Sequence, residues 1–233
     1  MPGATGRLKW DETGKKTYET GVDRGVLYPQ DSSGTYPAGY AWNGLTGVTE
    51  SPSGAEATKL YANNGNYVTL YSAEEFGFTL TAYTYPKEFE ACDGSVELTE
   101  GVTIGQQTRT PFGLSYRTLI GNDTQGQNHG YKIHIIYGAM VSPSEKGYTT
   151  VNDSPEAIEF SWEGTTTPVN VTGQKPTATL VIDSTVVSAA AMKAIEDKLY
   201  GTDAASGGSP AATAAALPLP DDILQIISDA DGE

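Results

Sequence analysis

Residues 76–82 alternate between apolar and polar side chains, which is the period of a half-buried β-strand. Proline cannot donate to a strand ladder, so Pro86 is expected to end the strand. Residues 87–92 then predict one helical turn with Phe89 pointing inward. This stretch predicts a core strand that ends in a rigid, acidic, aromatic corner, and such corners are common places for one subunit to meet another. The residues on its inward face are Phe76, Phe78, Leu80 and Ala82.

The same alternation predicts two hairpins, one before this stretch and one after it. Residues 58–62 and 67–71 are expected to pair across a turn made by Asn63, Asn64 and Gly65. Residues 114–120 and 131–137 predict a longer hairpin, in which residues 121–130 form either a solvated loop tip or a protruding contact loop ordered by a partner. Shorter strands are expected at 24–28, 41–44, 96–98, 102–104, 157–163, 169–172 and 177–183.

One helix is strongly indicated, at residues 189–200. Ser188 is a natural N-cap, Met192, Ile195 and Leu199 share one face, and Gly201 suits the position after the last turn. The other predicted helix is a short amphipathic one in the acidic segment 217–233, with Ile223, Ile226 and Ile227 at helical spacing. That segment follows a flexible linker at 202–216, so it predicts a docking peptide or an unstructured end, and docking is favoured.

Residues 1–56 are only weakly patterned and are rich in Gly, Thr, Ser and Pro. We expect an N-terminal arm or long loop region, because the segment is unlikely to build a core of its own. Its aromatic side chains must pack either on the domain behind it or on a neighbouring chain. Among them are Tyr36, Tyr40 and Trp42.

Composition narrows the class of protein. A chain of 233 residues suits either one large all-β domain or one domain with an appendage. Its formal net charge of −15 opposes specific binding to nucleic acid. The single Cys92 excludes a disulfide within the chain. We find neither the apolar core of a signal peptide nor an apolar run long enough to span a membrane, so we expect the chain to fold in a cytoplasm.

The pattern contains no recognisable catalytic or metal-binding motif. Phosphate-cradling and dinucleotide-binding glycine motifs are absent, and His129, His134 and Cys92 lack zinc-site spacing. Acidic residues cluster near the corner, but they surround a turn, as solvated edge charges do. We therefore expect no enzymatic activity, cofactor or metal. The clustered acids are Glu74, Glu75, Glu88, Glu90 and Asp93.

Four blocks of the chain resemble the major tail tube protein of long-tailed, siphovirus-type bacteriophages. They are residues 59–95 (KLYANNGNYVTLYSAEEFGFTLTAYTYPKEFEACDGS), 101–123, 131–169 and 175–184. The resemblance covers roughly residues 1–201, and it implies a mainly β tail tube fold: a β-sandwich or small barrel with one flanking α-helix, long loops and terminal arms.

The resemblance also implies a function and a set of partners. Six copies are expected to close into a ring, and rings to stack into the hollow tail tube of a virion assembled in the host bacterial cytoplasm. The implied partners are the tape measure, tail terminator and distal tail proteins, and double-stranded DNA passes through the lumen without specific binding. No membrane is involved.

Given this resemblance, we expect inter-subunit contacts from the loops, the acidic corner and the basic residues. The basic residues are few, 14 against 29 acidic ones, so most of them could find an acidic partner. Arg109, Arg117, Lys132, Lys146 and Lys175 are candidate partners for acids on adjacent subunits. The full set of contact candidates is Tyr36, Tyr40, Trp42, Glu74, Glu75, Glu88, Glu90, Asn122, Asp123, Arg109, Arg117, Ile223, Ile226 and Ile227.

Two other classes of protein are alternatives. One is a carbohydrate-binding β-sandwich module of an adhesin, in which exposed Tyr36, Tyr40 and Trp42 would form a sugar platform. The other is a glycoside hydrolase, which needs a pair of carboxylates flanking a cleft.

Overall fold

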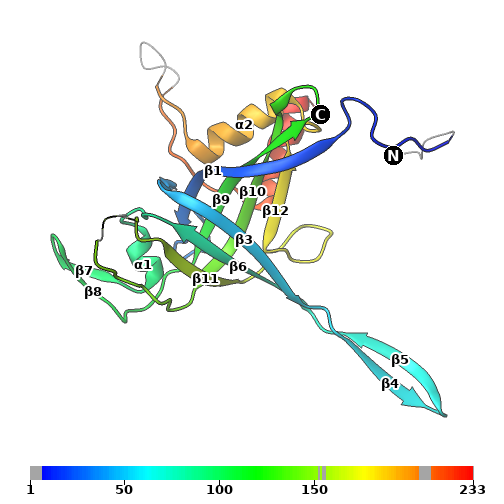
Figure 1. Ribbon diagram of the computed structural model, residues 1–233, viewed down its shortest axis with the longest axis horizontal. Helices are drawn as coiled ribbons and strands as arrows, with labels where there is room; N and C mark the ends of the chain where they lie inside the picture. The colour runs from blue at the N-terminus through cyan, green and yellow to red at the C-terminus, as the bar shows by residue number, and fades with distance from the viewer. Residues whose placement is uncertain (1–6, 152, 154–155, 205–210, 233) are drawn as a thin grey trace.

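The computed structural model describes residues 7–151, 153, 156–204 and 211–232, and these form a curled sheet, two projecting hairpins and three helices (Figure 1). The strands of the sheet are β1 (Thr17–Pro29), β2 (Tyr40–Ala41), β3 (Leu45–Gly54), β6 (Glu74–Ala82), β9 (Phe112–Asn122), β10 (Gly126–Val141), β11 (Phe160–Thr166) and β12 (Thr179–Asp183). The hairpins are β4 (Ala57–Ala62) with β5 (Gly65–Tyr71), and β7 (Val96–Thr99) with β8 (Val102–Ile104). The helices are α1 (Phe89–Asp93), α2 (Ala189–Tyr200) and α3 (Pro220–Asp231). The prediction of a mainly β chain is confirmed.

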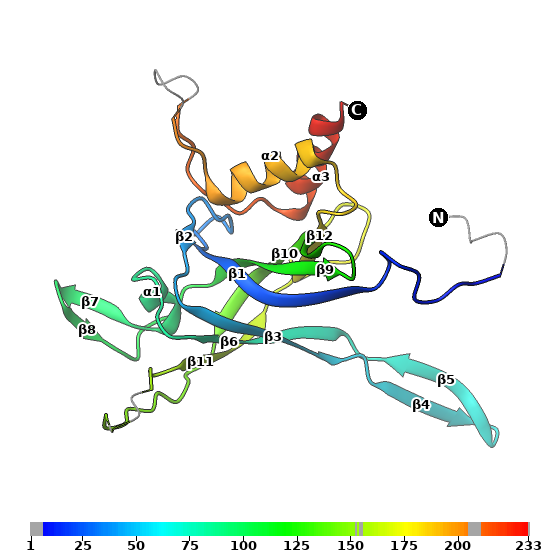
Figure 2. The ribbon, with the colours of Figure 1, turned by 45° about the horizontal axis from the view of Figure 1, so that its top comes forward.

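The sheet is antiparallel and folds back over itself. Hydrogen bonds join its strands in the order β2-β1-β9-β10-β11-β6-β3. The sheet divides at β10, whose residues 132–136 pair with β12 and whose residues 139–141 pair with β11. In Figure 2, β3, β6 and β11 lie below β1, β9 and β10, and α2 and α3 lie above them. The described residues therefore form a sandwich-like curl that is not closed into a barrel.

The inner core fills the space between the two halves of the curl. It is centred on Trp162 of β11, whose ring centroid lies 5.0 Å from that of Phe89 and 6.0 Å from that of Trp42. Phe89 is fully buried and belongs to α1, so the helical turn predicted after Pro86 packs into this core. Edge-to-face ring contacts of this kind stabilise a core beyond the area that they bury. The predicted inward face of residues 76–82 is also confirmed, because Phe78, Leu80 and Ala82 are buried.

The outer core lies on the opposite face of β1, β9 and β10, under α2 and α3. Alternate residues of β10 supply the two cores, with Ile133 and Ile135 facing the helices and Ile136 facing the inner core. The Ser188 side chain caps α2 by accepting a hydrogen bond from the Ala191 backbone N–H at 3.2 Å. The helix predicted at residues 189–200 is confirmed at both ends.

The C-terminal segment belongs to this outer core. Ile223 is only 2 % exposed, and Ile226 and Ile227 pack partly buried against the same cluster. The Tyr137 hydroxyl donates a hydrogen bond of 3.0 Å to the Pro218 carbonyl, just before α3. The predicted amphipathic helix is therefore confirmed, but the prediction that its isoleucines form a free docking patch is wrong, because the helix docks on its own chain.

The predicted linker is fastened at the two ends that the structure describes. Thr202 and Thr213 exchange backbone hydrogen bonds of 3.1 and 3.0 Å, and the Ala216 N–H donates to the Lys198 carbonyl at 2.9 Å. Residues 205–210 of this linker lie outside the described residues. These contacts hold the chain before α3 against α2, so the described parts of residues 202–216 are not a free tether.

The connection between β9 and β10 is shorter than predicted. β9 continues to Asn122 and β10 begins at Gly126, which leaves a tip of residues 123–125. The Asn122 side-chain oxygen closes the turn by accepting hydrogen bonds from the Thr124 and Gln125 backbone N–H groups at 3.1 and 2.6 Å. The expectation of a ten-residue loop at 121–130 is thus wrong, since Asn122 is buried at the end of β9 and only residues 123–125 form a loop.

The N-terminal segment supplies three strands of the sheet rather than a separate arm. β1 lies between β2 and β9, and Val26, Leu27 and Tyr28 of β1 are buried. Its register on β9 shifts on both sides of Asp23, and Arg24 has a φ of 49°. Such bulges interrupt the strict alternation of a strand, which explains why only residues 24–28 were predicted as extended.

Two other predicted strands differ from the structure. The strand expected at 157–163 runs from Phe160 to Thr166, so Ile158 precedes it and is 36 % exposed instead of pointing inward. The strand expected at 169–172 is reduced to a single bridge between Val169 and Thr177. In contrast, residues 177–183 contain β12 as predicted.

Gly138 allows a bulge in β10, the strand that contributes residues to both cores. Its φ is 56°, its N–H donates to the Tyr36 hydroxyl at 2.9 Å, and a Cβ atom there would lie 2.2 Å from the Thr167 carbonyl oxygen. We expect Gly138→Ala to lower the free energy of unfolding by about 1–3 kcal/mol, measured by urea denaturation. Gly173→Ala is the control, because Gly173 also has a positive φ, 74°, but faces open space. Equal losses in the two variants would show that crowding against Thr167 has no effect.

Candidate assembly surfaces

The first candidate surface is the β4–β5 hairpin, residues 57–71, which we call the first arm. Asn63 and Asn64 have φ angles of 50° and 59°, and a two-residue type I′ turn needs positive φ at both central positions. The predicted hairpin and its turn are confirmed. Cross-strand pairing places three aliphatic side chains on one face of the hairpin. They are Leu60, Val68 and Leu70, which are 45 %, 39 % and 53 % exposed.

The first arm has no core of its own. It projects from the end of β3 and the start of β6, well away from both cores (Figures 1 and 2). Every residue of β4 is exposed, and the face opposite the aliphatic one carries Lys59, Tyr61 and Tyr71. A lone two-stranded hairpin is at best marginally stable in water. An aliphatic face on such a hairpin is therefore a surface that would gain stability from a partner.

The second candidate surface is the β7–β8 hairpin, residues 96–104, which we call the second arm. The strands alternate, so one face is polar and holds Glu97, whose carboxylate pairs with Lys87 at 2.6 Å. The other face carries aliphatic side chains that are 43 %, 65 %, 50 % and 37 % exposed: Val96, Leu98, Val102 and Ile104. Both short strands were predicted, but the sequence did not indicate that they would project as an uncovered pair.

The predicted contact residues Glu74 and Glu75 lie at the root of the first arm. Both are exposed and begin β6. A hollow of about 980 Å³ lies beside this root, lined by Glu74 and by mainly apolar residues that include Tyr71 and Phe76. Lys175, another predicted contact residue, lines the same hollow. The structure thus gathers three predicted residues at one place on the surface.

The predicted residues Glu88 and Glu90 flank the start of α1. Glu88 is exposed and occupies the N-cap position without a side-chain capping bond, and Glu90 is half-buried in the first turn. Arg109 lies beside the end of α1 and donates to the Asp93 carbonyl at 2.9 Å. This corner stays a candidate contact region next to the second arm.

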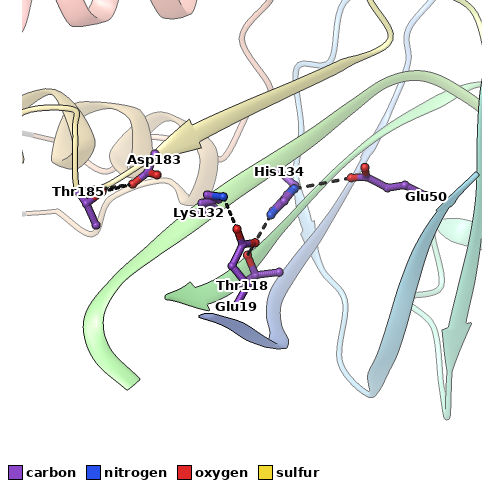
Figure 3. Close-up of polar contacts among 7 residues, drawn as sticks. All are labelled: Glu19, Glu50, Thr118, Lys132, His134, Asp183 and Thr185. Atoms are coloured by element: carbon purple, nitrogen blue, oxygen red, sulfur yellow. Dashed lines mark hydrogen bonds and ion pairs between the residues drawn. The ribbon is translucent and has the colours of Figure 1, made fainter. Parts of the chain in front are cut away.

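A polar cluster lies between β3, β9 and β10. The His134 ring stacks on Tyr116 at 4.8 Å between centroids, its Nε2 lies 3.0 Å from the Thr118 hydroxyl, and its Nδ1 lies 3.7 Å from a Glu50 carboxylate oxygen. Glu50 also accepts a hydrogen bond of 2.6 Å from the Tyr116 hydroxyl. Figure 3 shows Lys132 beside Glu19, with which it forms an ion pair. The cluster therefore joins β3 to β9 and β10 across the curl.

His134 is more buried than a surface-strand residue. It faces away from Ile133 and Ile135, as predicted, but the Tyr116 stack leaves only 13 % of its side chain exposed. Burial lowers the pKa of His134 below its ordinary value, against the opposing effects of Glu50 and Glu19. The neutral ring is therefore the form that the folded chain favours.

This burial predicts a loss of stability in mild acid. The unfolded chain takes up the His134 proton near pH 6.5, above the pH at which the folded chain does, so stability falls as pH drops below about 6.5. The loss is about 1.4 kcal/mol for each pH unit between the two pKa values. We expect His134→Gln to flatten this part of the pH profile in urea denaturation, and His129→Asn to leave it in place. An unchanged slope in His134→Gln would contradict the assignment.

Most of the predicted basic contact residues already have partners in their own chain. The Arg117 guanidinium donates two hydrogen bonds to the Asp23 carboxylate, at 2.7 and 2.6 Å, and these hold the pKa of Asp23 below its usual range. Lys146 pairs with the Asp93 carboxylate at 2.6 Å. Together with Arg109 and Lys132, four of the five therefore bind groups within the chain, which makes them weaker candidates for pairing with a neighbour.

The predicted aromatic residues are mostly core residues. Tyr36 and Trp42 are 2 % and 4 % exposed, and the Trp42 indole N–H donates to the Thr84 carbonyl at 2.9 Å. Tyr40 is half-buried in β2. The prediction that Tyr36 and Trp42 are exposed is wrong, because the curl of the sheet covers Trp42 and the segment before α3 covers Tyr36. A sugar platform built on these three residues therefore loses two of them.

Of the two predicted contact residues Asn122 and Asp123, only Asp123 is exposed. Its carboxylate accepts a hydrogen bond of 2.9 Å from the Gly14 backbone N–H, and the Asn122 amide donates to the Gly14 carbonyl at 3.3 Å. The hairpin tip thus fastens the segment that leads into β1. This contact lies within the chain and was not predicted.

Chemical sites are not evident in the described part of the chain. No group of three His, Cys, Asp or Glu side chains among those residues is arranged to hold a metal ion. No helix in the same residues has both the length and the apolar character needed to cross a membrane.

Comparison with models of protein families and with curated protein sequences finds no match. Among solved structures, the chain is weakly similar to one from the PVC sheath–tube complex of an extracellular contractile injection system in its extended state. The TM-score is 0.31 and the sequence identity 11 %, over 69 % of this chain and 88 % of that one. A likeness this coarse does not define the fold, so the function is argued from the residues themselves.

Proposed function

We propose that the chain is a structural subunit of a phage-type tail tube that acts by self-association and has no enzymatic activity. The observation that carries this proposal is the pair of arms, each of which exposes an aliphatic face that nothing in the described chain covers. Exposed apolar surface of this kind marks sites of protein association. The sequence blocks that resemble the major tail tube protein of siphovirus-type phages contain residues 59–71 of the first arm and residues 101–104 of the second.

The open sheet supports the same proposal. Among the described residues, β3 pairs only with β6 at one edge of the sheet, and the first half of β1 pairs only with β9 at the other edge. Unpaired strand edges favour the addition of a strand from another chain, and joining sheets around a ring removes them. In the proposed assembly six copies close into a ring and rings stack into a tube. The sheet of each subunit forms part of the tube wall.

The charge of the chain supports passage of DNA without specific binding. A formal net charge of −15 repels phosphate. In the proposed virion the tube would therefore let double-stranded DNA slide through its lumen. The tape measure, tail terminator and distal tail proteins are the partners that a tube of this kind would need, and assembly would take place in the host cytoplasm.

Negative-stain electron microscopy of the purified chain over a range of concentrations tests the proposal. We expect six-membered rings or uniform hollow tubes whose abundance rises with concentration. The measurement is repeated with the tape measure protein of the same phage. Compact monomers under both conditions would overturn the proposal.

A further inference from the structure

We propose that the two arms bind each other between copies, so that the aliphatic face of the first arm of one copy packs on the aliphatic face of the second arm of the next. This inference rests on the proposed function, because it names the surfaces through which the subunit associates with itself. Its occupant is a second copy of this chain, and three observations support that choice.

The first observation is the match between the two faces. Each arm is a two-stranded antiparallel hairpin with one aliphatic face. Leu60, Val68 and Leu70 make this face in the first arm, and the cross-strand pair Val96–Ile104 makes it in the second together with Leu98 and Val102. Sheet faces of this kind pack side chain to side chain, as in a β-sandwich. Packing the faces together would remove both from water and give each hairpin the core that it lacks.

The second observation is the charge on the arms. Lys59 is the one charged residue among residues 57–71, whereas residues 96–104 carry only Glu97 and Glu100. Glu97 already pairs with Lys87. Lys59 and Glu100 have no ion-pair partner among the described residues, so each arm presents one unpaired charge, and the two are of opposite sign. Two first arms would carry charge of the same sign, whereas a first arm and a second arm carry unpaired charges of opposite sign.

The third observation is the position of the arms. They project from opposite ends of the molecule in both views, so they cannot reach each other within one chain (Figures 1 and 2). A contact between unlike surfaces at opposite ends is head-to-tail, and repetition of such a contact gives a closed ring or an open filament. Arm pairing can therefore repeat to build a large assembly, whereas a symmetric contact would stop at a dimer.

Engineered cysteines test the pairing directly. Cys92 is buried and burial raises its pKa to about 12, so it will not compete for a thiol reagent. Leu70→Cys and Leu98→Cys place thiols at exposed positions on the two arms, and Val186→Cys, 76 % exposed before α2, is the control. Each variant, and each pairwise mixture, is treated with a short bismaleimide and separated on a denaturing gel.

We expect covalent dimers in the Leu70→Cys and Leu98→Cys mixture and in neither variant alone, and none when Val186→Cys replaces either partner. Dimers of Leu70→Cys with itself, or no dimers in the mixture, would overturn arm pairing. Microscopy of the same samples separates the two proposals. Tubes without arm cross-links would overturn the pairing alone, and cross-links in samples without rings or tubes would overturn only the tail tube function.

Charge reversal gives an independent check. Lys59 lies on the face of the first arm opposite the aliphatic one, so it would attract the second arm at a distance without forming an ion pair. Lys59→Glu and Glu100→Lys should each raise the concentration needed for assembly by about twofold, because each leaves the two arms with unpaired charges of the same sign. The double variant should return it towards that of the unaltered chain. A double variant that assembles no better than the single ones would contradict electrostatic attraction between the two arms.

Discussion

Replacement of Trp162 by alanine is expected to lower the free energy of unfolding by about 3–5 kcal/mol. Trp162 is fully buried, and its ring lies among those of Phe89, Tyr85 and Phe160, with centroids 5.0, 5.5 and 5.8 Å away. The variant would leave a cavity at the point where α1 meets both halves of the curl. Urea denaturation followed by circular dichroism measures the loss.

Trp10→Ala is the matched control for this prediction. Trp10 is 73 % exposed, so its removal should change stability by no more than about 0.5 kcal/mol. A loss at Trp162 of the same size as at Trp10 would contradict the assignment of Trp162 to the centre of the inner core.

Ile223→Ala is expected to lower the free energy of unfolding by about 2–5 kcal/mol. Ile223 belongs to α3, points into the outer core and is 2 % exposed. This variant decides whether the acidic C-terminal segment is part of the folded chain or an independent docking peptide. If the segment were only a docking peptide, the substitution would leave the stability of the isolated chain unchanged. Thermal and urea unfolding of the isolated chain measure the difference.

Leu224→Ala is the control on the same helix. Leu224 is the next residue of α3 and is 59 % exposed, so we expect its replacement to change stability by about 0.5 kcal/mol or less. The two variants remove a similar side chain one position apart, so they differ mainly in the face of the helix that they affect. Equal effects would show that α3 does not pack as described.

Arm pairing and the core predictions concern separate properties of the chain. The variants at Trp162 and Ile223 act on stability, whereas those on the arms change exposed residues outside both cores. We therefore expect arm variants to fold normally and to differ in assembly, a contrast that distinguishes a contact surface from a structural one.

Local patterns predicted the elements whose signals lie within a few consecutive residues. Asn63 and Asn64 suit a tight turn by themselves, Ser188 caps a helix whose apolar stripe is regular, and the alternation at 76–82 is uninterrupted. These signals depend on backbone dihedral angles and on side-chain period, which are local properties. The bounds of α2 and the inward faces of the main strands could be read directly from them.

Other features depend on contacts between distant parts of the chain. Bulges around Asp23 and Arg24 break the alternation of β1, so most of a 13-residue strand was not recognised. The amphipathic pattern of α3 showed that one face needs cover but did not show that the same chain supplies it. Likewise, the burial of His134 follows from its stack on Tyr116 of the neighbouring strand.

The sequence by itself determined that this chain is a mainly β protein with a capped helix and an acidic character, because alternation, turn residues and charge are local or additive. Only the tertiary structure decided which apolar faces are covered. It buried Tyr36, Trp42 and Ile223 and left Leu60 and Leu98 exposed, although all five are apolar or aromatic. The physical reason is that burial depends on which segments the curl of the sheet brings together, and each arm projects beyond that curl.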